Sequence, residues 1–205
     1  MSPPEQKSID SNESSARSTR TIPVILFGLG GVGQALLLRL LRARNFHRDH
    51  YGILFDLTCV TDSRGMVLPR EDNLGEDQLL EILEKKRSGL PLSQCRFGRR
   101  FPGPVEAVSR YCVPETLVID CTATLDTAPA LIKALESGGK VVLANKKPLT
   151  STLDLYRKLT GDPAVTRWET TVPSCLPVVS TLNRIVASGD EVLRISGTYS
   201  GTLGF

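Results

Sequence analysis

Apolar residues occur in short runs along this chain, and the runs alternate between strand-like and helix-like spacing. The run at 22–27 is apolar on both faces and rich in β-branched residues, which predicts a strand in the centre of a parallel sheet. By the same criteria, further strands are predicted at 53–61, 117–121, 140–144, 166–168 and 195–199. Helices are predicted at 34–44, 76–87, 105–111, 126–137, 149–160 and 178–187.

This alternation predicts an α/β fold, a doubly wound parallel sheet with right-handed crossovers. We place this domain at residues 21–170. Residues 1–20 are rich in serine and contain almost nothing apolar, so we expect a disordered tail. Ligands of such sheets bind at the carboxyl ends of the strands, which brings 120–124 and 145–147 to the same mouth as the loop after the first strand.

Glycines follow the first predicted strand directly, in the spacing Gly28-Leu-Gly30-Gly-Val-Gly33. Between a strand and a helix, this spacing predicts a dinucleotide-binding loop. The first glycine permits a tight turn, the second lets backbone N–H groups approach a pyrophosphate, and the third lets the helix pack on its strand. Gly31 and Val32 lie in the same loop, and the N-terminus of the following helix stabilises the phosphate charge.

An acidic residue, Asp62, ends the second strand, where such folds hold the ribose of the cofactor. It lies further from Gly33 than the usual distance of about 20 residues, so we expect the connection at 45–51 to be longer than usual. The alternative interpretation of Asp62 is a turn residue at a strand end, a common role of Asp before Ser.

Composition narrows the functional classes. The 205 residues are 40% hydrophobic and 23% charged, with a net charge of +3, as in a globular protein of one or two domains. Arg96, Arg99 and Arg100 form a small basic cluster that we interpret as a solvated loop, with phosphate contact as the alternative. No broader basic face is evident, so nucleic acid is not an expected partner.

The cysteines form no CxxC pair, and their odd number argues against both a zinc site and a disulfide framework; they are Cys59, Cys95, Cys112, Cys121 and Cys175. Cys175 is either a structural residue or a reactive thiol. Two histidines in a predicted polar loop do not make a metal site. No stretch reaches the roughly 20 apolar residues of a membrane span. We therefore expect a cytoplasmic protein, with a plastid address left open.

Two lysines, Lys146 and Lys147, follow the strand at 140–144 and precede Pro148. An ammonium at the ligand edge of the sheet would stabilise a carboxamide, a carboxylate or a developing oxyanion. A solvated strand end is an equally good interpretation of the residue types alone.

Several runs together resemble the homoserine dehydrogenase family. In order, they are Val141-Val-Leu-Ala-Asn-Lys-Lys-Pro, Glu169-Thr-Thr-Val with Leu176-Pro, Gly189-Asp-Glu-Val and Ser200-Gly-Thr-Leu. The resemblance spans about 22–205. It implies NAD(P)H-dependent reduction of aspartate 4-semialdehyde to homoserine, a step in threonine and methionine biosynthesis.

The resemblance also implies roles for individual residues. Gly28, Gly30 and Gly33 would hold the pyrophosphate, and Thr122 would touch the cofactor. Lys146 would lie between nicotinamide and substrate as the catalytic residue.

Two residues near the predicted ribose site would act on cofactor choice in opposite directions. Arg64 would pair with the 2′-phosphate of NADP, whereas Asp62 would repel it and favour the free hydroxyl of NAD. The choice between NADP and NAD therefore stays open.

Members of the family also bind a monovalent cation such as Na⁺ in a loop. Pro173 and Cys175 replace glycines usual in that loop, which puts the site in question. The matching ligand positions here are Glu169, Val172, Ser174 and Leu176.

The chain stops at Phe205, where the catalytic region of the family begins. By the resemblance, residues 171–205 begin a second α+β catalytic and dimerisation domain that is truncated here. With the catalytic region complete, the resemblance implies a homodimer. The competing hypothesis is a non-catalytic module that binds a nicotinamide nucleotide without turning a substrate over.

Overall fold

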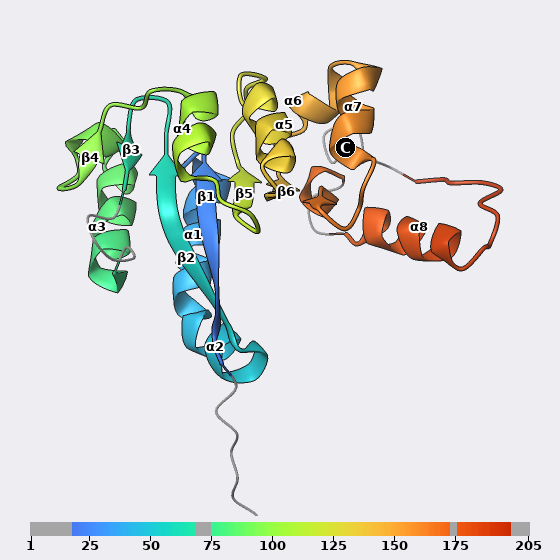
Figure 1. The fold of residues 1–205 in the computed structure, drawn as a ribbon, viewed down its shortest axis with the longest axis horizontal. Coiled ribbons are helices and arrows are strands. Elements are labelled where there is room, and N and C mark those ends of the chain that lie inside the picture. Colours follow the sequence, from blue (N-terminus) through green and yellow to red (C-terminus); the bar gives the residue numbers. More distant parts are fainter. Residues whose placement is uncertain (1–17, 69–74, 173–175, 198–205) are drawn as a thin grey trace, which may run out of the picture.

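The computed structural model describes residues 18–68, 75–172 and 176–197. These residues form a seven-stranded sheet in the order β4-β3-β2-β1-β5-β6-β7 (Figure 1). The strands are β1 (Arg20–Phe27), β2 (Ile53–Thr61), β3 (Met66–Val67), β4 (Gly98–Arg99), β5 (Leu117–Asp120), β6 (Lys140–Leu143) and β7 (Thr166–Arg167).

The sheet is parallel from β2 across β1, β5 and β6 to β7, as predicted. The two short strands β3 and β4 pair antiparallel at the other edge, which the prediction of an all-parallel sheet missed. Their position depends on a turn after β2, in which the Asp62 amide donates to the Gly65 carbonyl at 2.9 Å. Strands of two residues carry no detectable periodicity, so only the folded turn reveals them.

The described helices are α1 (Gly31–Arg42), α2 (Arg44–Tyr51), α3 (Glu76–Arg87), α4 (Pro104–Tyr111), α5 (Ala128–Glu136), α6 (Lys147–Thr150), α7 (Leu153–Thr160) and α8 (Val178–Ala187), with 3₁₀ turns η1 (Leu92–Gln94) and η2 (Glu169–Thr171). Helices α3 and α8 and strand β2 have the predicted bounds. None of the helices within the described ranges has both the length and the apolar character needed to cross a membrane.

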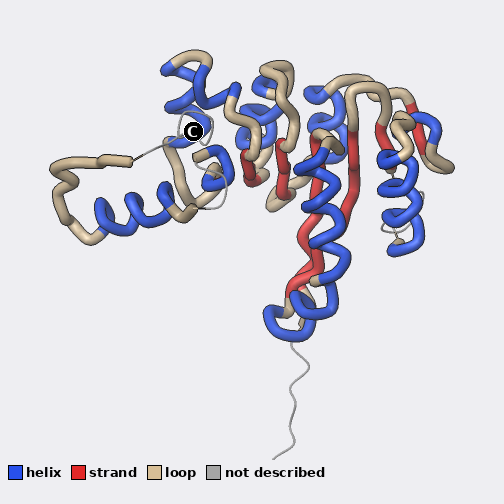
Figure 2. The backbone as a smooth tube through the Cα atoms, turned by 180° about the vertical axis from the view of Figure 1, so that it is seen from behind, coloured by secondary structure: helices blue, strands red, loops and turns tan. Residues whose placement is uncertain are grey.

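The sheet is the middle of three layers, with a hydrophobic core on each of its faces. Strand β1 contributes side chains to both cores. Val24 and Leu26 face the core under α1 and α3, whereas Ile25 and Phe27 face the core under α4, α5 and α7. All four side chains are fully buried. Figure 2 shows α1 lying along one face of the sheet. Full burial on both faces explains why this run reads as continuously apolar.

Three predictions of secondary structure were wrong. The segment around His47 and His50, predicted as a polar loop, is helix α2, which packs His47 edge-on against Phe55 of β2 with ring centroids 5.4 Å apart. The helix at 149–160 is broken into α6 and α7, because the Thr152 hydroxyl accepts a hydrogen bond from the Leu155 amide and starts a new helix. The strand at 195–199 is absent over its described residues 195–197, which are exposed and have no strand beside them.

Most of the predicted tail, residues 1–17, lies outside the described residues. Arg20 belongs to β1 rather than to the tail, since its amide donates to the Gly52 carbonyl at 2.7 Å. Ser174, Cys175 and residues 198–205 also lie outside the described residues.

Candidate functional site

The glycine loop lies where the strand order reverses, between β1 and its neighbours β2 and β5. Gly28 has φ +87°, and a Cβ there would lie 2.8 Å from Thr122 Cγ2. A Cβ on Gly33 would lie 2.0 Å from the Gly28 carbonyl oxygen. At Gly30 and Gly31, by contrast, an added Cβ would meet no atom within 4 Å. The first and third glycines are therefore needed for packing, and the middle of the loop is open for a ligand.

A cavity of about 750 Å³ lies against this loop. Its walls come from the ends of β1, β2 and β5 and from α3, α4 and the start of α5: residues 27–32, 61–63, 121–124, Lys86, Phe101, Pro104, Asp126 and Thr127. Helix α1 begins beside it and has no acidic residue in its first turn. The positive end of the helix dipole is thus left for an anionic ligand.

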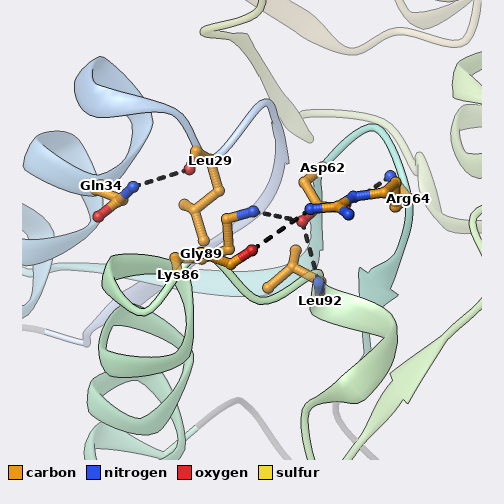
Figure 3. Close-up of polar contacts among 7 residues, drawn as sticks. All are labelled: Leu29, Gln34, Asp62, Arg64, Lys86, Gly89 and Leu92. Carbon is orange, nitrogen blue, oxygen red and sulfur yellow. Dashed lines mark hydrogen bonds and ion pairs between the residues drawn. The ribbon is translucent and has the colours of Figure 1, made fainter.

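Asp62 lies at the mouth of this cavity, but both of its carboxylate oxygens are bound within the chain (Figure 3). Oδ1 accepts from the Arg64 amide at 2.8 Å. Oδ2 accepts from Lys86 Nζ at 2.6 Å and from the Leu92 amide at 3.0 Å. Burial opposes ionisation, but these three donors outweigh it and hold the pKa of Asp62 below its usual value. Asp62 is therefore an ionised group that ties α3 and η1 to the end of β2.

Sequence reasoning missed Lys86, which lines the cavity and is only 14% exposed in its side chain. The feature of the sequence that could have indicated Lys86 is the basic last turn of α3, where Lys85, Lys86 and Arg87 are adjacent. Only the folded helix shows which of the three turns toward Asp62. Arg64 does not line the cavity wall, and with the described part of the chain its guanidinium makes one long contact, 3.5 Å from the Gly89 carbonyl oxygen.

Thr122 lines the cavity and is held by the fully buried carboxylate of Asp120. The Thr122 amide and hydroxyl both donate to Asp120 Oδ1, at 2.9 and 2.7 Å. Oδ2 accepts from the Thr127 hydroxyl at 2.7 Å and from the Asn145 amide group at 3.0 Å. Neutral donors thus satisfy this carboxylate and fix the loop after β5.

Lys146 is exposed and lines a second cavity of about 420 Å³, together with Tyr156, Trp168 and α8. The structure therefore gathers Gly28, Gly30, Gly31, Val32, Asp62 and Thr122 around one cavity, places Gly33 beneath the loop, and puts Lys146 in the neighbouring cavity.

The predicted cation loop is described in part, because Ser174 lies outside the described residues. The carboxylate of Glu169 accepts from the amides of Val179 at 2.9 Å and Ser180 at 2.8 Å, and so caps the N-terminus of α8. Val172 and Leu176 are both exposed, and the Leu176 carbonyl accepts from the Val178 amide at 2.9 Å.

The described cysteines behave as structural residues. Burial raises the pKa of the Cys59 and Cys121 thiols to about 12, so both stay protonated at neutral pH. Cys121 lines the cavity beside the glycine loop, but its protonated thiol is not a nucleophile.

No protein-family model matches the chain. The chain is 30% identical over 195 residues to the chloroplastic bifunctional aspartokinase/homoserine dehydrogenase of Daucus carota, covering 92% of this chain and 20% of the relative.

Solved structures show the same similarity. The homoserine dehydrogenase of Thermoplasma acidophilum superimposes with a TM-score of 0.62 at 28% identity, covering 82% of this chain and 49% of that one. A hyperthermophilic archaeal homoserine dehydrogenase in complex with NADPH shares the fold, with a TM-score of 0.65 at 23% identity, covering 80% of this chain and 48% of that one. The chain thus spans about a fifth of the plant relative and about half of these solved chains. In sequence and in fold, the chain is a relative of the homoserine dehydrogenases over a part of their length.

Proposed function

We propose that this chain is the nucleotide-binding part of an oxidoreductase that reduces aspartate 4-semialdehyde to homoserine with NADPH. The observation that carries the proposal is the 750 Å³ cavity at the reversal of strand order, with the open backbone of Gly30 and Gly31 at the start of α1. The relationship to homoserine dehydrogenases supplies the reaction. NADPH in the archaeal relative supports the choice of a nicotinamide cofactor.

The residues around the glycine loop fit such a cofactor. Backbone N–H groups of Gly30, Gly31 and Val32 would bind the pyrophosphate at the positive end of α1. Thr122, fixed by Asp120, would border the nicotinamide. When bound, the nicotinamide supplies the hydride for reduction of the aldehyde.

The exposed ammonium of Lys146 is proposed to serve the substrate rather than the phosphates, because it lines the neighbouring cavity. There it would donate a hydrogen bond to the carbonyl oxygen of the aldehyde and stabilise the negative charge that develops on it.

Charge at the rim of the cofactor cavity favours NADP over NAD. A free carboxylate at Asp62 would repel a 2′-phosphate, but this carboxylate is 8% exposed and is paired with Lys86. Arg64 lies outside the cavity wall, two residues after Asp62, and its guanidinium makes only the long contact to Gly89 among the described residues, so it would have to turn toward the ribose to bind a phosphate. We therefore infer that NADPH binds more tightly than NADH.

A titration of the purified chain with NADPH and NADH, followed by fluorescence of the reduced nicotinamide, tests this proposal. Aspartate 4-semialdehyde is then added to the same sample. Binding with oxidation of the nucleotide would support the full reaction. Binding without oxidation would support a nucleotide-binding module that needs further chain for turnover, and failure to bind either nucleotide would overturn the proposal.

We extend the proposal to a monovalent cation at residues 169–176. The support is that Val172 and Leu176 are exposed residues and that the Leu176 carbonyl, which accepts one hydrogen bond, keeps a second lone pair. Thermal unfolding in sodium chloride and in choline chloride at equal ionic strength tests it. Equal midpoints in the two salts would contradict the cation site.

Self-association is proposed for the chain with its catalytic region complete. Its support is the exposed apolar side chains of Val186, Leu193 and Ile195 in and after α8. Analytical ultracentrifugation of such a chain would give a dimer mass if this is right and a monomer mass if it is wrong.

A further inference from the structure

The amide side chain of Asn145 joins the ends of two neighbouring strands, β5 and β6. Its Nδ2 group lies 3.0 Å from Asp120 Oδ2, 3.1 Å from the Thr122 hydroxyl and 2.6 Å from the Thr124 carbonyl oxygen. Its Oδ1 accepts from the Lys147 amide at 3.1 Å. Asn145 is 2% exposed, so water competes little for these contacts.

Asp120 anchors the other side of this arrangement. Its fully buried carboxylate accepts from the Thr122 amide, the Thr122 hydroxyl and the Thr127 hydroxyl, in addition to Asn145. Thr127 is the residue from which α5 begins. An ionised carboxylate is a pure acceptor, so it can hold several donors in one geometry. The ends of β5 and β6 and the start of α5 are thereby locked together.

Asn145 lies between residues that line the two cavities, so its hydrogen bonds connect the cavity walls. Thr122, Thr124 and Thr127 line the cofactor cavity, whereas Lys146 lines the neighbouring one. Asn145 lines neither, but its amide contacts Thr122 and Thr124 on one side and the backbone of Lys147 on the other.

We propose that Asn145 is a positioning residue that fixes Lys146 relative to Thr122 and so couples the substrate-side cavity to the cofactor cavity. This inference rests on the proposed function, since it assigns a cofactor to one cavity and a substrate to the other. Hydride transfer is sensitive to geometry, and a misplacement of about 1 Å can cost about 10²-fold in rate. A rigid hydrogen-bonded bridge between the two cavities meets that requirement.

The first test needs no ligand, so it does not depend on whether the nucleotide assignment is right. In the ¹⁵N-labelled full chain, Thr122→Val removes one hydroxyl in the cofactor cavity while keeping the shape of the side chain. We expect faster hydrogen exchange at the Lys147 amide in this variant. In the Asn145→Ala background the same Thr122→Val change should have no further effect on Lys147, because the bridge is already cut.

The second test uses NADPH as the probe. Addition of NADPH should shift the amide signals of Lys146 and Lys147 in the wild-type chain and leave Lys133 of α5 unmoved. In Asn145→Ala the shifts at Lys146 and Lys147 should be lost while the glycine loop still binds NADPH.

An isosteric variant, Asn145→Asp, separates the donor function of the Asn145 amide from its acceptor function. It keeps the oxygen that accepts from Lys147 but sets a second carboxylate at hydrogen-bond distance from Asp120. The oxygen that replaces the amide nitrogen has no proton to donate to Asp120, Thr122 or Thr124, so the contact with Lys147 is kept while the contacts on the other side are lost. We expect the NADPH-induced shifts at Lys146 and Lys147 to be absent in Asn145→Asp, as in Asn145→Ala.

The outcomes distinguish the two proposals. Failure of the wild-type chain to bind NADPH or NADH overturns the proposed function. An absence of any effect of Thr122→Val on Lys147, or an effect equally large with and without Asn145, overturns the coupling role. If Asn145→Ala does not fold, Asn145→Ser, whose shorter neutral side chain cannot contact both sides, serves as the background for the same comparison.

Discussion

Lys86 Nζ lies 2.6 Å from Asp62 Oδ2, and both side chains are largely buried at the rim of the cofactor cavity (Figure 3). The two residues come from different elements, the end of β2 and the last turn of α3. The pair thus has two consequences. It fixes α3 against the sheet, and it removes a free negative charge from the place where a 2′-phosphate would bind.

Replacing Lys86 with methionine should weaken NADPH binding more than NADH binding. Methionine preserves most of the aliphatic packing, but the Asp62 carboxylate is then left without its cation and repels the 2′-phosphate. We expect the ratio of the two dissociation constants to change by about tenfold, which corresponds to about 1.4 kcal/mol. Lys85→Met, one residue earlier in the same helix, is the matched control. An unchanged ratio in Lys86→Met would remove this residue from cofactor selection.

Stability should depend on the ionisation of Asp62 in acid. The pKa of this group in the folded chain is below its ordinary value of 3.8, so the folded state favours the charged form. Its stabilisation is fully present above that ordinary value and is lost as the pH falls through the folded pKa. Urea unfolding of the wild type and Asp62→Asn should therefore differ by a constant free energy at pH 6 and 7, and by less at pH 3. A difference that grew in acid would reverse this assignment.

Much of the fold and the place of the glycine loop between β1 and α1 could be predicted from the sequence, because both depend on local pattern. The apolar run of β1 and the spacing of Gly28, Gly30 and Gly33 lie within a few residues of one another. Helices α3 and α8 follow from regular apolar spacing. Helix α2 could not be found in this way, since most of its residues are polar and it is supported by the contact of His47 with Phe55.

The contacts that organise the site escaped prediction because they join residues far apart in the chain. The sequence predicts Asp62 at the ribose position, but its partner Lys86 lies 24 residues further on. Asp120 and Asn145 are 25 residues apart, and local pattern places each only in a loop at a strand end. The sequence indicates which residues reach the ligand edge of the sheet, and the packing of the elements decides which of them bind one another.

Alanine at Gly30 should reduce nucleotide binding without a matching loss of stability. Gly30 is the N-cap of α1, its φ is −75°, and a Cβ would meet no atom within 4 Å, so the folded chain accepts the substitution. The added methyl group would occupy the space in which the pyrophosphate approaches the backbone. We expect a loss of affinity of at least about tenfold for both NADPH and NADH.

Gly75→Ala is the matched control for this change. Gly75 is also an N-cap, that of α3, with φ −65° and an equally open Cβ position, but it does not line the cofactor cavity. The two variants should lose the same small amount of stability in urea unfolding, because glycine is preferred to alanine at an N-cap. Equal nucleotide affinities in the two variants would count against phosphate binding at Gly30.

Alanine at Gly33 should have the opposite profile, with a large loss of stability. A Cβ at this position would lie 2.0 Å from the carbonyl oxygen of Gly28, a backbone atom that cannot rotate away. Helix α1 would have to move off β1, which disturbs the fully buried Leu26 and Leu37 between them. Overpacking of this kind costs about 1–3 kcal/mol and occasionally more. Urea unfolding should show a loss in that range for Gly33→Ala, well above that of Gly30→Ala. If Gly33→Ala were as stable as Gly30→Ala, the close packing of α1 on β1 would not be what requires glycine here.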